Sequence, residues 1–436
     1  LVDLLRPATR GIPDVYRANF RHFYFDIAWY GVLAASAIAF VSVYAARLGG
    51  NAFQIGLLTA GPAVVNLLVT LPAVRWLRDR PLNPIVGQAA ALHRVWYLFW
   101  IILPWLLPPA AQVWVLIGLT LLMSAPGALL AVGFNALFAE AVPPEWRGQV
   151  SGVRNALLSV TYILISLLCG ALLDRMAFPL GYQVVFAIGF VGGALSTLHV
   201  WLIKPCPNGP SRPRVGRSLG DLATPGRIRG PADAVRPGGG LRFLLRGPRA
   251  PLLTVDVLRG PFGKLVAVLF AFHVALNVGI PLFPLHWVNR LHLTDQEIGL
   301  GTAVFYICVF AASTRLAQLA RRLGNQRVTA VGAALMSTYP AWMALSSGLG
   351  LFLVGSAVGG LGWALVGGAM VNYVLEKVPE DRRPDYLAWY NLALNAALLL
   401  GSLIGPLLAG VIGVPATLFV SAALRLGTAL AILLWE

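Results

Sequence analysis

Charged residues are scarce in this chain. Of its 436 residues only 11% are Asp, Glu, Lys or Arg, whereas 58% are hydrophobic. Soluble domains typically carry about 25% charged and about 45–50% apolar residues. A soluble protein could not cover this surplus of apolar surface, so the soluble enzyme classes are excluded. The composition predicts an all-α polytopic membrane protein.

Cysteine and the common catalytic motifs are also lacking. The three cysteines (Cys169, Cys206 and Cys308) are scattered singly, so neither a disulfide framework nor a metal cluster is encoded. There is no GxxxxGK[ST] phosphate loop, no HExxH and no pair of carboxylates deep within an apolar run. We therefore expect a protein that is not an enzyme and binds no cofactor or metal. The first 25 residues have no cleavable apolar core, so no secretory signal is expected.

Long apolar runs dominate what is present. A membrane-spanning helix needs about 20 mostly apolar residues, and the sequence predicts twelve. The first six are 26–47, 53–77, 84–107, 112–139, 148–173 and 180–203. The second six are 263–288, 297–320, 327–347, 350–377, 384–411 and 414–435.

A polar segment separates the two sets of spans. Residues 204–262 are rich in Pro, Gly and Arg, and such a composition cannot bury a core. We predict four parts: an N-terminal segment 1–25, a six-helix bundle 26–203, a flexible basic linker 204–262 and a second six-helix bundle 263–436.

The net charge of +16 would indicate nucleic-acid binding in a soluble protein. Here Arg and Lys concentrate at the N-terminus, in the linker and in the turns after spans two, four, eight and ten. The opposite turns carry only Arg47, Arg175 and Arg290. Because excess positive charge marks cytoplasmic loops, both termini and the linker are predicted to face the cytoplasm. We expect an integral protein of the plasma (cytoplasmic) membrane with no nucleic-acid partner.

The two sets of spans repeat one pattern. Residues around the first outer turn return 243 positions later: Arg47-Leu48, Ile55-Gly56-Leu57 and Thr59-Ala60 as Arg290-Leu291, Ile298-Gly299-Leu300 and Thr302-Ala303. Residues near the turn into span five return at an offset of 236: Val142-Pro143, Arg147 and Asn155 as Val378-Pro379, Arg383 and Asn391. The repeat is parallel because it contains an even number of spans. Two such halves leave a midplane cavity between them, as in secondary transporters.

With these features the chain resembles the major facilitator superfamily over essentially its whole length. The superfamily's signature after span two, Gly-x-x-x-Asp-Arg-x-Gly-Arg-Arg, is present in degraded form. It is represented by Asp79-Arg80 in the first half and by Arg321-Arg322 and Gly324 in the second. The resemblance implies twelve transmembrane helices in two parallel six-helix repeats. It also implies a charged cytoplasmic latch in which Asp79 caps a neighbouring helix when the protein faces outward. The segment Gly401–Gly410, similar to a Gly-Pro motif of antiporters, favours antiport.

Ionisable and polar groups at membrane depth are candidates for substrate binding or ion coupling, because they are costly there. Arg94 lies about 10 residues into span three, near the midplane, and is either a substrate contact or a structural charge. For Arg425, which lies in the middle of span twelve, the interpretation as a structural charge is favoured. His273 and Asn277 share a face of span seven, where Pro281 and Pro284 interrupt the helix; His273 is either a proton or substrate site or a core histidine. The full candidate set is His93, Arg94, His273, Asn277, Tyr30, Trp363 and Asn391.

A second set of candidates lies toward the cytoplasmic ends of the spans. Asp26 opens the first predicted span near the cytoplasmic interface. It is either a helix-start carboxylate or a gate or proton site paired with a basic residue such as Arg154. The predicted cytoplasmic gate comprises Asp26, Asp79, Arg80, Glu140, Arg154, Asn155, Arg322, Gly324 and Asp385.

These observations predict a secondary transporter that moves a small organic solute by alternating access. Export of an amphipathic, drug-like compound coupled to an ion gradient is preferred. Organic-anion uptake is the alternative, motivated by Arg94 and Arg425. A transporter-shaped assembly or structural subunit that no longer transports is the competing class. The expected partners are a small-molecule substrate and the lipid bilayer, with the protein a monomer or a subunit of a larger membrane complex.

Overall fold

The computed structural model describes residues 14–77, 81–143, 145–204, 255–379 and 383–434. The secondary structure within these ranges is helical, with no β-strand, and twelve helices are long and apolar enough to cross a membrane. The predicted fold class is confirmed, and the chain is an integral membrane protein. The division at 204–262 remains a prediction, because most of that segment lies outside the described ranges.

The N-terminal half comprises α2 to α9 and the C-terminal half α11 to α17. The helices of the first are α2 Asp14–Leu33, α3 Ala39–Arg47, α4 Ala52–Leu77, α5 Leu82–Val95, α6 Tyr97–Leu106, α7 Pro109–Ala141, α8 Arg147–Arg175 and α9 Leu180–Trp201. Those of the second are α11 Pro261–Gly279, α12 Leu282–Leu285, α13 Asp295–Leu323, α14 Asn325–Leu345, α15 Leu349–Glu376, α16 Arg383–Ile412 and α17 Val414–Leu434. Short π-helical segments, Ala34–Ile38 and His286–Arg290, interrupt the first and seventh spans, and a 3-10 turn, Val255–Leu258, precedes α11.

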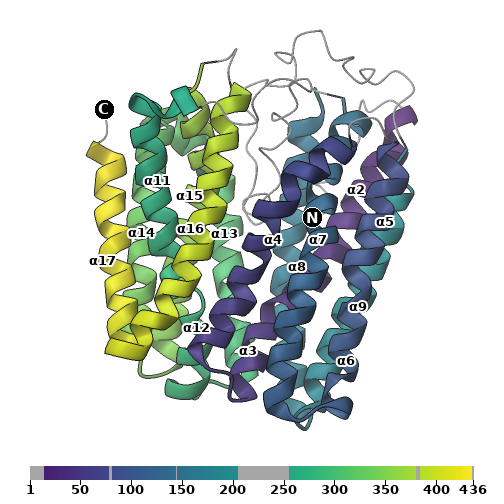
Figure 1. Ribbon diagram of the computed structural model, residues 1–436, viewed down its shortest axis with the longest axis vertical. Coiled ribbons are helices and arrows are strands. Elements are labelled where there is room, and N and C mark those ends of the chain that lie inside the picture. The colour runs from purple at the N-terminus through teal and green to yellow at the C-terminus, as the bar shows by residue number, and fades with distance from the viewer. Residues whose placement is uncertain (1–13, 78–80, 144, 205–254, 380–382, 435–436) are drawn as a thin grey trace.

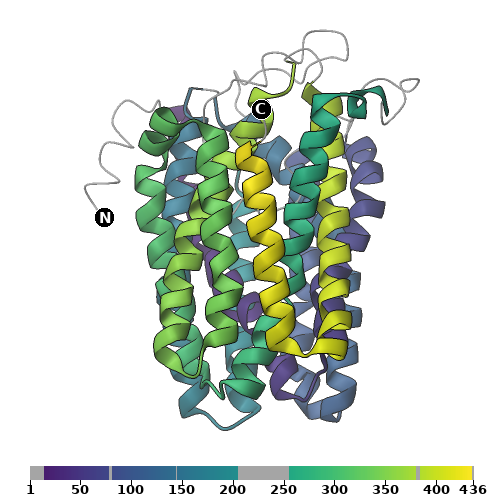
Figure 2. The same cartoon turned by 90° about the vertical axis from the view of Figure 1, so that its left-hand side faces the viewer.

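The helices run between two ends of the molecule (Figures 1 and 2). We call the end where α9 stops and α11 starts the linker end, at the top of Figure 1. The opposite end, where α3 meets α4, is the far end.

The first span is longer than predicted. Its helix begins at Asp14, so Asp26 lies well inside α2 and is fully buried. The prediction that Asp26 opens the helix is therefore wrong, and the helix-start interpretation with it, whereas its place near the membrane interface stays a prediction. The preceding residues were missed because their arginines interrupt the apolar run.

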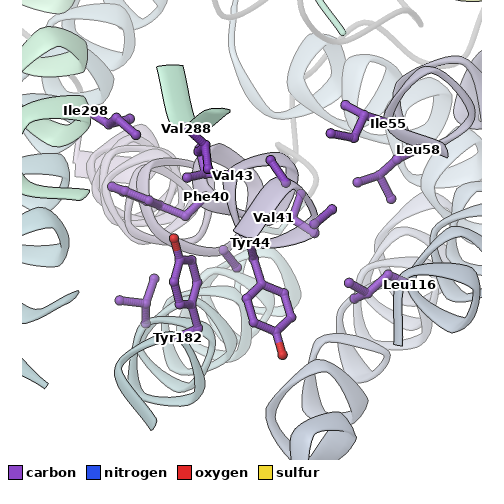
Figure 3. Close-up of a cluster of buried hydrophobic side chains, with 14 of the residues drawn as sticks. Phe40, Val41, Val43, Tyr44, Ile55, Leu58, Leu116, Tyr182, Val288 and Ile298 are labelled. Carbon is purple, nitrogen blue, oxygen red and sulfur yellow. The ribbon is translucent and has the colours of Figure 1, made fainter. Parts of the chain in front are cut away.

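Among the residues that the structure describes, the cluster of buried side chains that both halves share lies toward the far end. There, one cluster of buried side chains joins Phe40 and Tyr182 of the N-terminal half to Val288 and Ile298 of the C-terminal half (Figure 3). Toward the linker end the core divides into separate clusters, one in the N-terminal half and two in the C-terminal half. The halves are thus packed together at the far end.

The repeat found in the sequence has a structural counterpart at two helix starts. Before α4, the side chains of Asn51 and Gln54 each accept the other's backbone N–H at 2.9 Å. Before α13, Thr294 and Glu297 form the same reciprocal cap at 3.2 and 2.8 Å. These pairs are separated by the offset of 243 read from the sequence. The same capping motif therefore starts the second membrane span of each half.

The two halves meet along two seams that the repeat relates to each other. Helix α4 packs on α16, and α13 packs on α8. At the first seam Gly56 lies against the Ser402 carbonyl, where an added Cβ would be 2.7 Å from the oxygen. At the second, Gly299 lies against the Ser166 carbonyl, where a Cβ would be 2.5 Å away. Both glycines therefore permit a helix approach that a side chain would block.

Candidate functional site: the interface between the two halves

An ion pair joins the halves at the far end. Arg47 of α3 contacts Asp295 of α13 at 3.0 Å, and the same guanidinium donates to the carbonyl of Leu293 at 2.7 Å. The Tyr182 hydroxyl of α9 donates to the Asp295 carboxylate at 2.8 Å. Two side chains of the N-terminal half, one from α3 and one from α9, therefore converge on the start of α13 in the other half.

The start of α13 also receives a carboxylate from the N-terminal half. The backbone N–H groups of Asp295 and Gln296 donate to Asp174 of α8 at 3.0 and 3.2 Å. A carboxylate is favourable at this position, because the first N–H groups of a helix have no partner within it. We call Arg47, Asp174, Tyr182 and Asp295 the far-end latch.

Tyrosines gather between the halves near the middle of the spans. The rings of Tyr162 on α8 and Tyr306 on α13 stack with centroids 3.9 Å apart. Tyr30 of α2 lies close enough to interact electrostatically with Tyr162, Tyr306 and Tyr97 of α6. This tyrosine cluster offers aromatic faces and hydroxyl groups at membrane depth, and it includes the predicted site residue Tyr30.

The two deep arginines point into the halves. Arg94 is 3% exposed and donates to the Thr197 hydroxyl of α9 at 2.7 Å. Arg425 is buried and donates to the carbonyls of Ala275, Leu276 and Met336 on α11 and α14. These contacts agree with the structural interpretation of Arg425, and Arg94 also ties two helices of its own half together.

The contacts found for the remaining substrate candidates are with groups of their own half. His93 contacts the Met123 carbonyl at 2.8 Å, and Asn277 and Asn391 each donate to a carbonyl of their own helix at 2.7 Å. His273 packs its ring on Phe272 and Tyr390, and its buried Nε2 has no hydrogen-bond partner. Trp363 packs against the core of the C-terminal half at the linker end.

The predicted pairing of Asp26 with Arg154 is present. Arg154 contacts the Asp26 carboxylate at 3.1 Å, and the Ser196 hydroxyl donates to that carboxylate at 2.5 Å. The guanidinium lies 4.9 Å from the ring centre of Phe134 and 5.5 Å from that of Phe23. These groups come from α2, α7, α8 and α9, so the cluster holds one half together. The contacts just described all lie within the N-terminal half, whereas a gate between the halves would need a partner across the seam.

Replacing Arg154 by Met should destabilise the protein, because it leaves a buried carboxylate without its cation. The expected loss in the free energy of unfolding is about 3–5 kcal/mol. It should be measured as a lower midpoint of thermal unfolding in detergent. Adding Asp26→Asn should recover much of the loss. The exposed Arg322→Met is the matched control. An unchanged midpoint for Arg154→Met would contradict this assignment.

The other gate candidates lie near the linker end. Glu140 ends α7, Asn155 lies on α8, and Arg322 is exposed in the last turn of α13. Gly324 separates α13 from α14 with φ +81°, a conformation that favours glycine. Asp79 and Arg80 lie outside the described residues, as does the side chain of Asp385.

Sequence reasoning missed most of the far-end latch. Arg47 was noted only as a residue of an outer turn, and neither Asp174, Tyr182 nor Asp295 was singled out. Asp295 could have been found from the sequence, because it is an acidic residue at the start of a span and lies close after Arg290, the repeat counterpart of Arg47.

Comparisons with known proteins agree with this architecture. Residues 265–436 match the family model described as the Major Facilitator Superfamily. This chain has the Major Facilitator Superfamily fold. The family match in the C-terminal half and the fold of the whole chain agree with the resemblance found in the sequence. No curated protein matches the chain in sequence.

Solved structures of transporters share the fold over nearly the whole chain. A bacterial homologue of the iron transporter ferroportin, in an inward-facing state, has a TM-score of 0.67 at 14% identity, covering 97% of this chain and 98% of that one. The human organic anion transporter MFSD10 has 0.62 at 13% identity, covering 97% and 100%. The nucleoside transporter NupG has 0.62 at 12% identity, covering 97% and 98%. At these identities the likeness is one of fold.

Proposed function

We propose that this chain exports a small amphipathic organic solute by alternating access, with energy from an ion gradient. The observation that supports this is the division of the hydrophobic core. One cluster spans both halves toward the far end, whereas each half has its own cluster toward the linker end. Such packing suits a state closed at the far end, from which rocking of the halves would give the opposite state.

The orientation belongs to the same proposal. Arg and Lys are concentrated in the linker and in the turns at the linker end, and excess positive charge favours the cytoplasmic side. The linker end would then face the cytoplasm of a cell with this protein in its plasma membrane. In this scheme the far-end latch holds the inward-facing state.

The substrate class follows from the groups between the halves. The tyrosine cluster offers flat apolar rings with hydroxyl groups, which suits an aromatic, amphipathic solute. Arg94 and Arg425 are engaged with Thr197 and with main-chain carbonyls. Their contacts give no support to organic-anion uptake.

Flux into proteoliposomes tests this function. We expect neutral and cationic aromatic solutes to move, anions to move poorly, and a pH gradient to change the rate. Replacing Tyr306 by Leu should lower the rate for aromatic solutes about tenfold. This corresponds to about 1.4 kcal/mol, near the top of the range for an aromatic pair. Tyr306→Phe keeps the ring and should retain most of the activity.

Two results would redirect the proposal. Selective flux of anions that is lost in Arg94→Met would favour organic-anion uptake. Absence of flux for every solute, together with stoichiometric co-purification of another membrane protein, would favour the non-transporting subunit.

A further inference from the structure

The repeat allows side chains on α16 to be compared with their counterparts on α8. Asn391, Asn395 and Ser402 on α16 follow Asn155, Ser159 and Ser166 on α8 by the same offset of 236. Spacings of four, seven and eleven residues bring each set to one side of its helix. Each seam helix therefore carries a polar stripe.

The α16 stripe faces the other half of the molecule. Its far-end member, Ser402, has its carbonyl against Gly56 of α4. Asn395 precedes Ser402 by about two helical turns and lies about 10 Å nearer the linker end on the same side. Asn395 is thus placed along the α4–α16 seam, whereas the residue of α16 that packs on the shared core cluster is Ala409, further toward the far end.

The two serines of the α8 stripe are hydrogen-bonded. The Ser159 hydroxyl donates to the Asn155 carbonyl at 3.1 Å, and the Ser166 hydroxyl donates to the Ile163 carbonyl at 3.2 Å. Both side chains bond to their own helix, as buried hydroxyl groups in helices commonly do.

The corresponding groups on α16 are not satisfied. The Asn395 amide nitrogen donates to the Asn391 carbonyl at 2.9 Å, but its Oδ1 is buried with no hydrogen-bond partner. The Ser402 hydroxyl is likewise buried and without a partner. Asn395 is only 5% exposed. An unpaired buried polar group costs about 1–3 kcal/mol, and the satisfied counterpart on α8 shows that the fold does not impose this cost.

We propose that Asn395 Oδ1 accepts a hydrogen bond from an N–H or O–H group of the transported solute. This rests on the proposed transport function and specifies its substrate class: neutral solutes that carry a hydrogen-bond donor. The amide nitrogen is already bonded to its own helix, so the group that faces the seam is an acceptor. A solute whose donor is blocked by methylation leaves this acceptor unpaired and is disfavoured.

Matched solute pairs in proteoliposomes containing the full chain test this assignment. The probes are neutral aromatic amides and their N,N-dimethyl analogues, beginning with nicotinamide. The wild type should prefer the donor-bearing member about tenfold in kcat/KM, mainly through KM. Asn395→Leu should remove the preference, and so should Asn395→Ser, which recreates the self-bonded residue of α8. Asn372→Leu on α15, where the amide also bonds its own helix, is the control and should keep it.

Stability provides a readout independent of transport. Because Asn395→Leu removes an unsatisfied buried group, the variant should unfold at or above the wild-type temperature. A marked loss of stability would mean that Oδ1 has a structural partner and would overturn the inference. Equal transport of both members of each pair by the wild type, or a preference that survives Asn395→Leu, would overturn it while leaving the transport function intact. If the wild type moves no solute at all, the proposed function fails and the inference fails with it.

Discussion

Replacing Asp295 by Asn should shift the protein toward a state open at the far end. The substitution removes the charge that binds Arg47 and weakens the acceptor of the Tyr182 hydroxyl. A hydrogen bond to a charged group contributes about 1.5–3 kcal/mol. The ratio of closed to open molecules should therefore fall about tenfold to a hundredfold.

The opening can be measured as a distance between spin labels. Ala110 at the start of α7 and Ser347 before α15 are exposed at the far end, one in each half. Pulsed electron paramagnetic resonance should show a longer distance population in Asp295→Asn. The swap of Arg47→Asp with Asp295→Arg should restore the shorter population, because it re-creates the ion pair.

Arg290 provides the matched control for this experiment. It is the repeat counterpart of Arg47 and is exposed at the same end. Arg290→Gln should leave the distance distribution unchanged. If Asp295→Asn behaves like Arg290→Gln, the ion pair does not stabilise the closed state.

Introducing a side chain at Gly299 should have an effect of similar size by a steric route. The Cβ of Gly299→Ala would lie 2.5 Å from the Ser166 carbonyl oxygen and 3.2 Å from the Gly170 Cα. Both neighbours are main-chain atoms, so the helices must separate. Overpacking of this kind typically destabilises a packed state by about 1–3 kcal/mol. We expect this cost to fall on the closed state, in which the two helices are in contact.

We therefore expect Gly299→Ala to lengthen the distance between labels at Ala110 and Ser347 and to slow transport about tenfold. Gly56→Ala should act in the same way at the other seam, where its Cβ would lie 2.7 Å from both the Ser402 oxygen and Pro406 Cγ. Gly118→Ala on α7 is the control, since its Cβ would meet nothing within 4 Å. Normal transport by both seam variants would show that the close approach is dispensable.

The resemblance and the repeat predicted more of the interface than the individual site candidates did. The offsets of 243 and 236 correctly indicated parallel halves, and Gly56 and Gly299 within that repeat prove to be the close contacts of the two seams. Arg94 was harder to interpret, because depth in the membrane shows that a charge needs a partner but not which helix supplies it. Its contact with Thr197 depends on how α5 packs on α9.

Asp26 illustrates the opposite error. Its position at the edge of an apolar run indicated a helix start, yet the helix extends 12 residues further toward the N-terminus. The pairing with Arg154 was nevertheless correct, since a deep carboxylate requires a cation.

The sequence by itself determined the membrane location, the twelve spans and the two parallel six-span repeats. These follow from the order of apolar residues along the chain, because each span must bury its own backbone polar groups in lipid. Only the tertiary structure decided which polar groups meet. Arg47 and Asp295 are 248 residues apart and lie in different halves, and only the packing of the two halves brings them together. Likewise, Ser166 and Ser402 occupy equivalent positions in the repeat, but packing leaves only the second without a hydrogen-bond partner.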